Sequence, residues 1–226
     1  MRSMIRGIVL SIALCLLASP AMADMTVVLS DGAGSGPGGE FHATYSGFPI
    51  APVGLTGGGY IEVFCVEKDE YIAFGKTYYV VLNTEAVDGG GGPNPDPLSS
   101  KTAYLYSQFI TGQLDDYEYV NAAGRQASAD ALQDVIWYLE QEQALNWTLG
   151  DDSLRDKFYQ DAVANAPSDD TDIGDVLVMN LYGDAAHTKG KQDQLVYIPT
   201  PIPAPGAAVL AALGVGMIGW VRRRQG

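Results

Sequence analysis

The sequence predicts an α+β fold, namely a β-sandwich or β-barrel into which a helical subdomain is inserted. In the first part of the chain, short runs of Val, Ile and Tyr alternate with glycine-rich segments. After Ser99 the apolar residues recur at intervals of three and four, and short apolar runs return after Asp175. Strands followed by helices and then strands are typical of an α+β domain, in which the sheet is mainly antiparallel.

The first strands are predicted from short Val, Ile and Tyr runs that end at turn-forming residues. They are expected at 25–29, 60–66 and 77–82. Glycine clusters separate or follow them, at 32–39, 57–59 and 89–92. Such clusters indicate loops within one domain, because glycine adopts the backbone angles that turns require.

The first two helices follow these strands. Ser99 or Ser100 is expected to cap the first helix, which ends near Gly112. The second helix is indicated by apolar residues at i, i+3, i+4 and i+7, namely Leu132, Val135, Ile136 and Leu139. This spacing places all four on one face, so we expect the helix to pack against the core.

A third helix is expected to begin at Asp151 or Asp152 and to end before Pro167, which cannot continue a helix. Two final strands are predicted at 176–181 and 194–198. The Asp-rich segment between the third helix and these strands, 169–175, is interpreted as a solvated loop.

The net charge excludes one class of function. The 226 residues carry 27 acidic and 13 basic side chains, which gives −14 at pH 7. A surface of this charge repels a phosphate backbone and has no basic stripe that would release counterions, so a nucleic-acid-binding function is excluded. The same charge disfavours docking on anionic lipid headgroups.

Residues 1–23 have the three parts of a secretory signal peptide. Arg2 and Arg6 form the basic start, an apolar run follows at 8–17, and Ala21-Met22-Ala23 provides a cleavage site. Cleavage removes Cys15 and leaves Cys65 as the single cysteine of the mature chain. One cysteine makes no internal disulfide, so Cys65 is inert, paired with another chain or chemically occupied.

Residues 199–226 form a second targeting segment. A proline-rich spacer precedes an uncharged stretch at 204–221, which is long enough to span a bilayer as a helix, and three arginines follow it. The arginine cluster favours the cytoplasmic side for the C-terminus, which places the domain at 24–198 outside. The residues that define the tail are Pro203, Ala204, Pro205, Arg222, Arg223 and Arg224.

This order of proline motif, apolar helix and arginine cluster resembles the PEP-CTERM sorting signal of Gram-negative bacteria. Ala204 stands where that family usually has Glu. The resemblance implies an exosortase-like processing enzyme and a temporary inner-membrane anchor that is removed as the protein reaches the cell envelope, the cell surface or the extracellular matrix. The alternative is a permanent single-span anchor.

Conventional catalytic and metal sites are not indicated. His42 and His187 lie far apart and in no metal-ligand spacing, and no phosphate-binding loop or nucleophile elbow is present. We therefore expect no cofactor, no metal site and no catalytic residues. A calcium site at Asp170, Asp172 and Asp175 is the alternative to a solvated loop, although the EF-hand pattern is absent.

Two short motifs carry a more specific resemblance. Phe64-Cys65-Val66 falls on a predicted strand, and Leu132-Gln133-Asp134-Val135-Ile136-Trp137 falls on the second predicted helix. This pair resembles the thioester domains of bacterial surface adhesins. In that family the cysteine sulfur and the glutamine side-chain carbonyl form an internal thioester with loss of ammonia, which implies a cross-link between Cys65 and Gln133. Ala103-Tyr104-Leu105-Tyr106 and, more loosely, Gln192-Asp193-Gln194-Leu195-Val196 extend the likeness.

The residue types suit this chemistry. A thioester lacks amide resonance and expels a thiol, so it acylates nucleophiles but must be protected from water. Trp137, at i+4 from Gln133, and Phe64 are expected to supply an apolar shield. The resemblance implies a surface adhesion or matrix-attachment protein. It would bind an amine-bearing ligand covalently, either a lysine of a protein or a polyamine, and it would not be an enzyme because the reaction occurs once.

Simpler interpretations exist for each residue. Cys65 is equally understandable as a small buried hydrophobe and Trp137 as a core residue, and Gln133 stands three residues after Asp130, the spacing of a capping box. These interpretations together describe a structural matrix protein without a thioester. A cysteine hydrolase that pairs Cys65 with His42 or His187 is a third hypothesis.

Overall fold

The structure is a computed structural model that describes residues 23–36, 38–56, 58–87 and 95–200. The signal peptide up to residue 22 and the tail from residue 201 lie outside the described residues, and so do Pro203, Ala204, Pro205 and the three arginines. Among the described residues, no helix is both long enough and apolar enough to cross a membrane.

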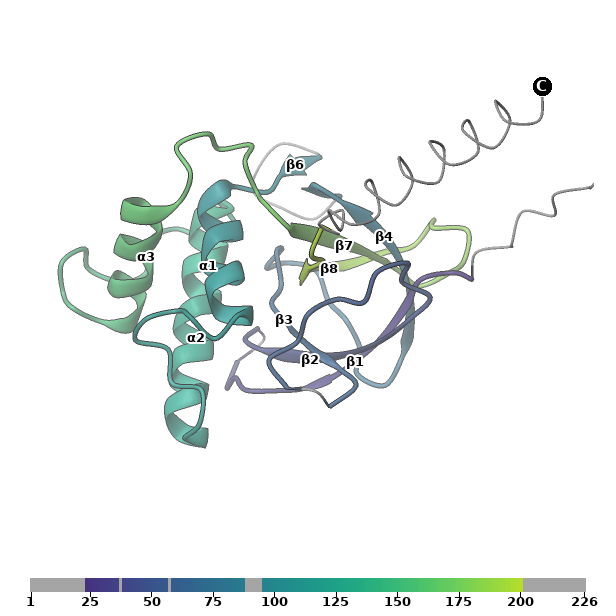
Figure 1. Cartoon of the computed structure of the whole chain (residues 1–226), viewed down its shortest axis with the longest axis horizontal. Coiled ribbons are helices and arrows are strands. Elements are labelled where there is room, and N and C mark those ends of the chain that lie inside the picture. Colours follow the sequence, from purple (N-terminus) through teal and green to yellow (C-terminus); the bar gives the residue numbers. More distant parts are fainter. Residues whose placement is uncertain (1–22, 37, 57, 88–94, 201–226) are drawn as a thin grey trace, which may run out of the picture.

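The described residues form eight strands and three helices, shown in Figure 1. In chain order they are β1 (Thr26–Asp31), β2 (Phe41–Ser46), β3 (Ile61–Val63), β4 (Thr77–Asn83), β5 (Glu85–Ala86), β6 (Asp96–Pro97), α1 (Ser100–Ile110), α2 (Ala122–Leu139), α3 (Leu154–Asn165), β7 (Val176–Tyr182) and β8 (Gly190–Tyr197). The α+β prediction is confirmed, because a large antiparallel sheet is combined with a helical group.

Six strands form one sheet in the order β3-β2-β1-β4-β7-β8, and all its pairs are antiparallel. The segment after β3 returns to the opposite edge of this sheet. Leu195 donates its N–H to the Phe64 carbonyl at 2.9 Å, and Val66 donates to the Asp193 carbonyl at 3.0 Å. The two edge strands therefore meet at the position that carries Cys65, which pairs with Gln194.

The three helices follow one another between β6 and β7 and gather on one side of the sheet (Figure 1). Each has a side-chain cap: Ser99, Asn121 and Ser153 accept hydrogen bonds from the first turns of α1, α2 and α3. A capping oxygen pairs with a main-chain N–H that has no partner inside the helix. The predicted cap at Ser99 is thereby confirmed.

The structure extends the second helix and corrects the start of the third. The apolar positions that indicated the second helix begin at Leu132, but α2 begins at Ala122, so Asp130 lies in its interior. The capping-box interpretation of Gln133 is therefore wrong, since Asn121 is the N-cap. The third helix was expected to begin at Asp151 or Asp152, but Ser153 is the N-cap of α3. The sequence analysis also missed β2, although Phe41 and Ala43 alternate with more exposed residues as expected for a half-buried strand.

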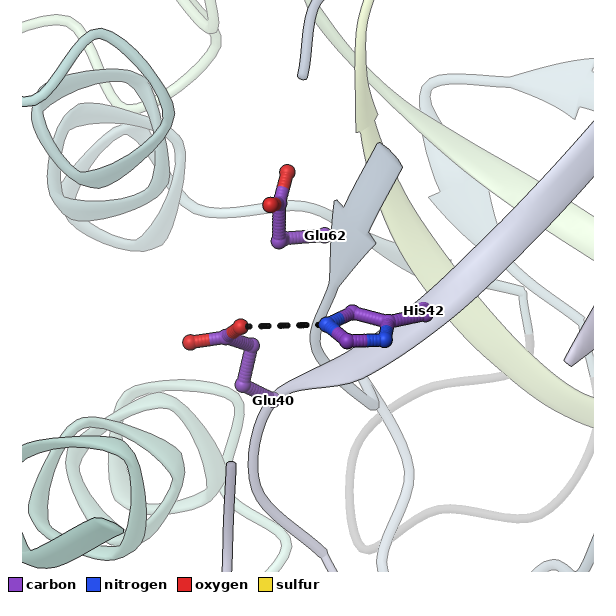
Figure 2. A group of neighbouring side chains, drawn as sticks. All are labelled: Glu40, His42 and Glu62. Atoms are coloured by element: carbon purple, nitrogen blue, oxygen red, sulfur yellow. Dashed lines mark ion pairs between the residues drawn. The ribbon is translucent and has the colours of Figure 1, made fainter. Parts of the chain in front are cut away.

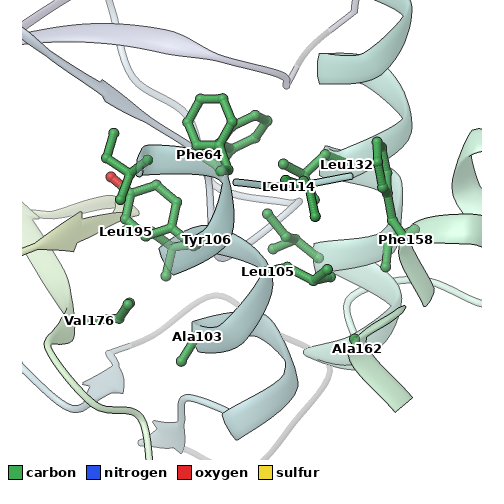
Figure 3. Close-up of a cluster of buried hydrophobic side chains, with 14 of the residues drawn as sticks. Phe64, Ala103, Leu105, Tyr106, Leu114, Leu132, Phe158, Ala162, Val176 and Leu195 are labelled. Carbon is green, nitrogen blue, oxygen red and sulfur yellow. The ribbon is translucent and has the colours of Figure 1, made fainter. Parts of the chain in front are cut away.

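The core divides into two apolar clusters. The helix–sheet cluster lies between the helices and the sheet, and Figure 3 shows part of it. It includes Phe64, Tyr106, Phe109, Leu132 and Phe158. The second, which we term the sheet cluster, includes Leu29, Ile61, Cys65, Trp137 and Met179. Cys65 and Phe64 are neighbours in sequence but belong to different clusters, because successive side chains of an extended segment point to opposite faces.

We expect Phe109→Ala to lower the free energy of unfolding by about 3–5 kcal/mol, because it removes a fully buried ring from the helix–sheet cluster. The Phe109 ring lies 5.0 Å from the Phe64 ring and 5.0 Å from the Tyr117 ring, centroid to centroid. Urea unfolding measures the change. Val163→Ala, at a half-exposed position of α3, is the control and should change stability little. Equal losses in both variants would contradict this view of the core.

Candidate functional site

The structure brings Gln133 and Cys65 into direct contact, although they are 68 positions apart. The Gln133 side-chain carbonyl accepts the Cys65 main-chain N–H at 3.1 Å, and the Gln133 amide donates to the Cys65 main-chain carbonyl at 2.9 Å. Both residues are buried. The carboxamide of α2 therefore lies flat against the segment that joins the two edges of the sheet.

The Gln133 carbonyl oxygen sits in a site with two main-chain donors. In addition to the Cys65 N–H, the Gly39 N–H points at Oε1 from 3.2 Å. Gly39 has φ +119°, which residues with a Cβ rarely adopt, so a glycine permits this direction of the N–H. Two N–H groups directed at one carbonyl oxygen are the arrangement that stabilises an oxyanion during acyl transfer.

The Cys65 thiol is enclosed. Its residue has no exposed surface, and Gln194 donates its side-chain amide to Sγ at 3.5 Å. Burial raises the pKa of the Cys65 thiol to about 12, so the free cysteine holds its proton at neutral pH. Cysteine hydrolases need a base, usually histidine, that takes up the thiol proton in every turnover, and the described hydrogen bonds of Cys65 include no such group. This environment therefore disfavours the hydrolase hypothesis.

Trp137 and Gly38 cover the Gln133 side chain. A Cβ placed on Gly38 would come within 3.0 Å of both the Trp137 ring and the Gln133 Cγ, so only glycine fits without a shift. The Lys68 ammonium lies 5.3 Å from the centre of a Trp137 ring. Trp137 is thus placed where a shield was predicted, whereas the Phe64 ring packs against Phe109 on the other face.

A cavity of about 200 Å³ opens beside these covered groups. It lies between α2 and the glycine-rich loop at 32–39 and includes Gln133 itself in its wall. The lining residues are Ser35, Gly36, Gly38, Asp130, Gln133, Asp134, Trp137 and Arg155. The loop is tied to α2 by Ser35, whose N–H and hydroxyl both donate to the Asp130 carboxylate.

Two buried carboxyl groups lie on the far side of Cys65. The Asp193 N–H donates to Glu67 at 2.6 Å, and Asp193 accepts from Val87, Asn180 and Leu181. Burial, together with the neighbouring Asp193 charge, raises the pKa of Glu67, so this carboxyl stays protonated at neutral pH. Burial also raises the pKa of Asp193, to about 7, so the pair holds at least one proton at neutral pH.

A second polar cluster consists of Glu40, His42 and Glu62, drawn in Figure 2. Their potential ligand atoms lie within 4.8 Å of one another. Arg125 already provides the cation of this cluster: its Nη2 lies 2.7 Å from Glu40 and 3.8 Å from Glu62. Burial raises the pKa of Glu62. We interpret the cluster as an arginine-centred ion network that ties α2 to β2 and β3.

The other residues proposed from the sequence have separate partners. Asp170 accepts from Ser100, and Asp175 accepts from Thr200. Among the described residues, Asp170, Asp172 and Asp175 do not form a group with metal-ligand geometry. His187 packs near Tyr79 and Tyr182, and the His42 ring lies 4.2 Å from the Tyr60 ring, so the described ring contacts of both histidines do not include Cys65.

Several groups of this site were not foreseen. Gly38 and Gly39 belong to a glycine cluster that the sequence indicates only as a loop, and Gln194 and Glu67 carry no local signal of their contacts.

Comparison with family models, curated proteins and solved structures found no match to this chain. The functional argument therefore depends on the geometry described above.

We expect Gly38→Ala to destabilise the protein by about 1–3 kcal/mol, because the added methyl group collides with Trp137 and Gln133. Urea unfolding measures the change. Gly36→Ala is a matched control in the same loop, since a Cβ there meets nothing within 4 Å. If the two alanine variants lose the same stability, close packing of Gly38 over the site is ruled out.

The carboxyl pair predicts how stability depends on pH. The folded-state pKa of Glu67 is raised, so its stabilising contribution is complete below the unfolded pKa near 4.3 and is lost as pH rises through the folded value. Glu67→Gln retains a hydrogen-bond donor but cannot ionise. We expect its free energy of unfolding to fall less than that of the wild type between pH 5 and pH 9.

Thermal or urea unfolding across this pH range provides the measurement. Asp115→Asn changes an exposed carboxylate and serves as the control, with the wild-type pH dependence expected. A pH profile of Glu67→Gln that matches the wild type would contradict the protonated state of Glu67.

Proposed function

We propose that this chain is an exported surface protein that binds a partner covalently through a thioester between Cys65 and Gln133. The observation that carries the proposal is the contact of the buried Gln133 carboxamide with the Cys65 main chain, with its carbonyl oxygen held by two N–H donors. The amide that donates to the Cys65 carbonyl is the group that would leave. No turnover follows, so the protein is not an enzyme in this proposal.

Formation of the bond is a simple acyl transfer. The Cys65 sulfur attacks Gln133 Cδ, the C–N bond breaks, and the thiol proton leaves with the amide nitrogen as ammonia. The Gly39 and Cys65 N–H groups stabilise the negative charge that develops on Oε1. Because both residues are buried, water has little access to the product.

Capture of a partner is a second acyl transfer, in which an amine is the nucleophile and the Cys65 sulfur is the leaving group. An amine nitrogen bonds to Gln133 Cδ, the C–S bond breaks, and the sulfur takes up the proton that the amine loses. The raised pKa of the Cys65 thiol, caused by burial, makes this sulfur a strong proton acceptor when it leaves. The products are an amide with the partner and a neutral thiol, so no charge remains in the apolar site.

The fold supports the same proposal. The hydrogen bonds that join the segment after β3 to β8 suit a six-stranded barrel, and the helices inserted between β6 and β7 suit the predicted helical subdomain. This arrangement agrees with the resemblance to bacterial thioester domains. Export by the signal peptide and sorting by a PEP-CTERM-like tail and an exosortase-like enzyme complete the proposal. They place the domain in the cell envelope, on the cell surface or in the extracellular matrix.

A structural role without a thioester is the second candidate. Gln133 makes three hydrogen bonds as an ordinary glutamine, so its burial needs no covalent bond. In this case the site connects α2 to the sheet through hydrogen bonds alone, and the protein is a non-reactive component of the envelope or matrix.

Intact mass distinguishes the two functions. We expect the purified chain to be lighter by about 17 Da, the mass of ammonia, than its processed sequence requires. Methylamine should then add its own mass at Gln133 and release a thiol that reacts with a maleimide. Cys65→Ala should show neither change.

Gln126→Ala is the control for this experiment. Gln126 is exposed, lies on the same helix and donates to the Gly34 carbonyl, so its variant should keep the mass loss and the methylamine adduct. An unshifted mass in freshly purified wild type, together with a free Cys65 thiol, would establish the structural function instead.

A further inference from the structure

The cavity beside Gln133 has an uneven charge distribution. It is lined by two carboxylates, Asp130 and Asp134, and one guanidinium, Arg155. Arg155 Nε lies 2.5 Å from Asp134, so these two charges cancel. The described partners of Asp130 are the uncharged N–H and hydroxyl of Ser35. The negative charge of Asp130 therefore remains uncompensated at the cavity wall.

Asp130 is placed one helical turn before Gln133 on α2. Residues at i and i+3 of a helix are neighbours, with about 5–6 Å between their Cβ atoms. Both side chains line the same cavity. A group that contacts the Asp130 carboxylate from within the cavity is thus held close to the Gln133 carbonyl carbon.

The size and polarity of the cavity restrict the ligand further. Its volume of about 200 Å³ is smaller than the roughly 300–1,000 Å³ of sites that enclose a whole small molecule. Trp137 offers its ring as an apolar wall. The cavity suits a narrow alkyl chain that ends in a cation.

From this arrangement we infer that the cavity is the entry site of the nucleophile and that Asp130 selects an unbranched primary alkylammonium group, as on a lysine side chain. The inference rests on the proposed thioester. Ser35 orients the Asp130 carboxylate, Trp137 packs against the methylene stem, and the ammonium nitrogen comes to rest beside Gln133.

The reaction begins with the loss of one proton from the bound ammonium. This proton passes to water at the cavity mouth, and a neutral amine remains. The amine nitrogen attacks Gln133 Cδ, the C–S bond breaks, and the second proton passes from nitrogen to the Cys65 sulfur. An amide and a thiol result, and no oxidant, reductant or metal is required.

The test compares two nucleophiles on the full chain. The probes are n-butylamine, which is an alkylammonium ion at neutral pH, and hydroxylamine, which is uncharged there. The rate of adduct formation is followed by intact mass at low ionic strength, where an exposed charge has its full effect. For Asp130→Asn we expect the n-butylamine rate to fall about fivefold, the size expected for one partly exposed ion pair. The hydroxylamine rate should be unchanged.

Asp115→Asn is the matched control, since it removes an exposed carboxylate that does not line the cavity. It should retain the wild-type selectivity for n-butylamine over hydroxylamine. Equal slowing of both probes by Asp130→Asn would overturn the inference, because it would show a general disturbance of the site. Unchanged rates with both probes would overturn it as well.

The same experiment separates the two proposals. If the wild type shows the loss of about 17 Da but Asp130→Asn leaves the relative rates of the two probes unchanged, the thioester proposal stands and only the selection of ammonium by Asp130 is refuted. Wild-type protein without the mass loss refutes both. Faster reaction of Nα-acetyl-lysine N-methylamide than of n-butylamine supports a polypeptide lysine as the source.

Discussion

The contact between the Gln133 carboxamide and the Cys65 main chain is the interaction on which the rest of the site depends. It joins the middle of α2 to the segment that connects the two edges of the sheet, and it does so through hydrogen bonds in both directions. Any displacement of the helical group relative to the sheet would leave a buried amide without partners, at a cost of about 1–3 kcal/mol for each unsatisfied group. The geometry of the site and the packing of the two parts of the fold are therefore maintained together.

Burial has two effects that act in the same direction. The apolar surroundings of Cys65 exclude water and thereby protect a hydrolysable bond. They also hold the pKa of the free thiol far above its usual value. In the proposed mechanism the second effect makes the departing sulfur a proton acceptor. Gln194 adds a weak donor to the same sulfur, and the protonated Glu67 keeps a second negative charge out of this region. The enclosure thus determines both the lifetime and the reactivity of the proposed bond.

Charge around the site is distributed unevenly along α2. Near its start, Arg125 pairs with the buried Glu40 and lies near Glu62. Further along the helix, Asp130 faces the cavity, where its described partners are uncharged, while Asp134 is paired with Arg155. In the proposed mechanism Asp130 attracts cations to the wall beside Gln133, and the net charge of −14 of the whole chain extends this attraction to longer range at low salt.

The sequence alone was sufficient to predict the α+β class, the apolar face of α2 and the i, i+4 relation of Gln133 and Trp137, because these follow from local periodicity. It also singled out Cys65 as the remaining cysteine after the predicted removal of the signal peptide, and the resemblance to thioester domains paired Cys65 with Gln133. Only the tertiary structure decided that the Gln133 carboxamide bonds to the Cys65 main chain, that Gly39 supplies a second N–H and that Glu67 pairs with Asp193. Each of these contacts joins residues far apart in the chain, so it depends on strand register and on the seating of the helices against the sheet, which no local pattern encodes.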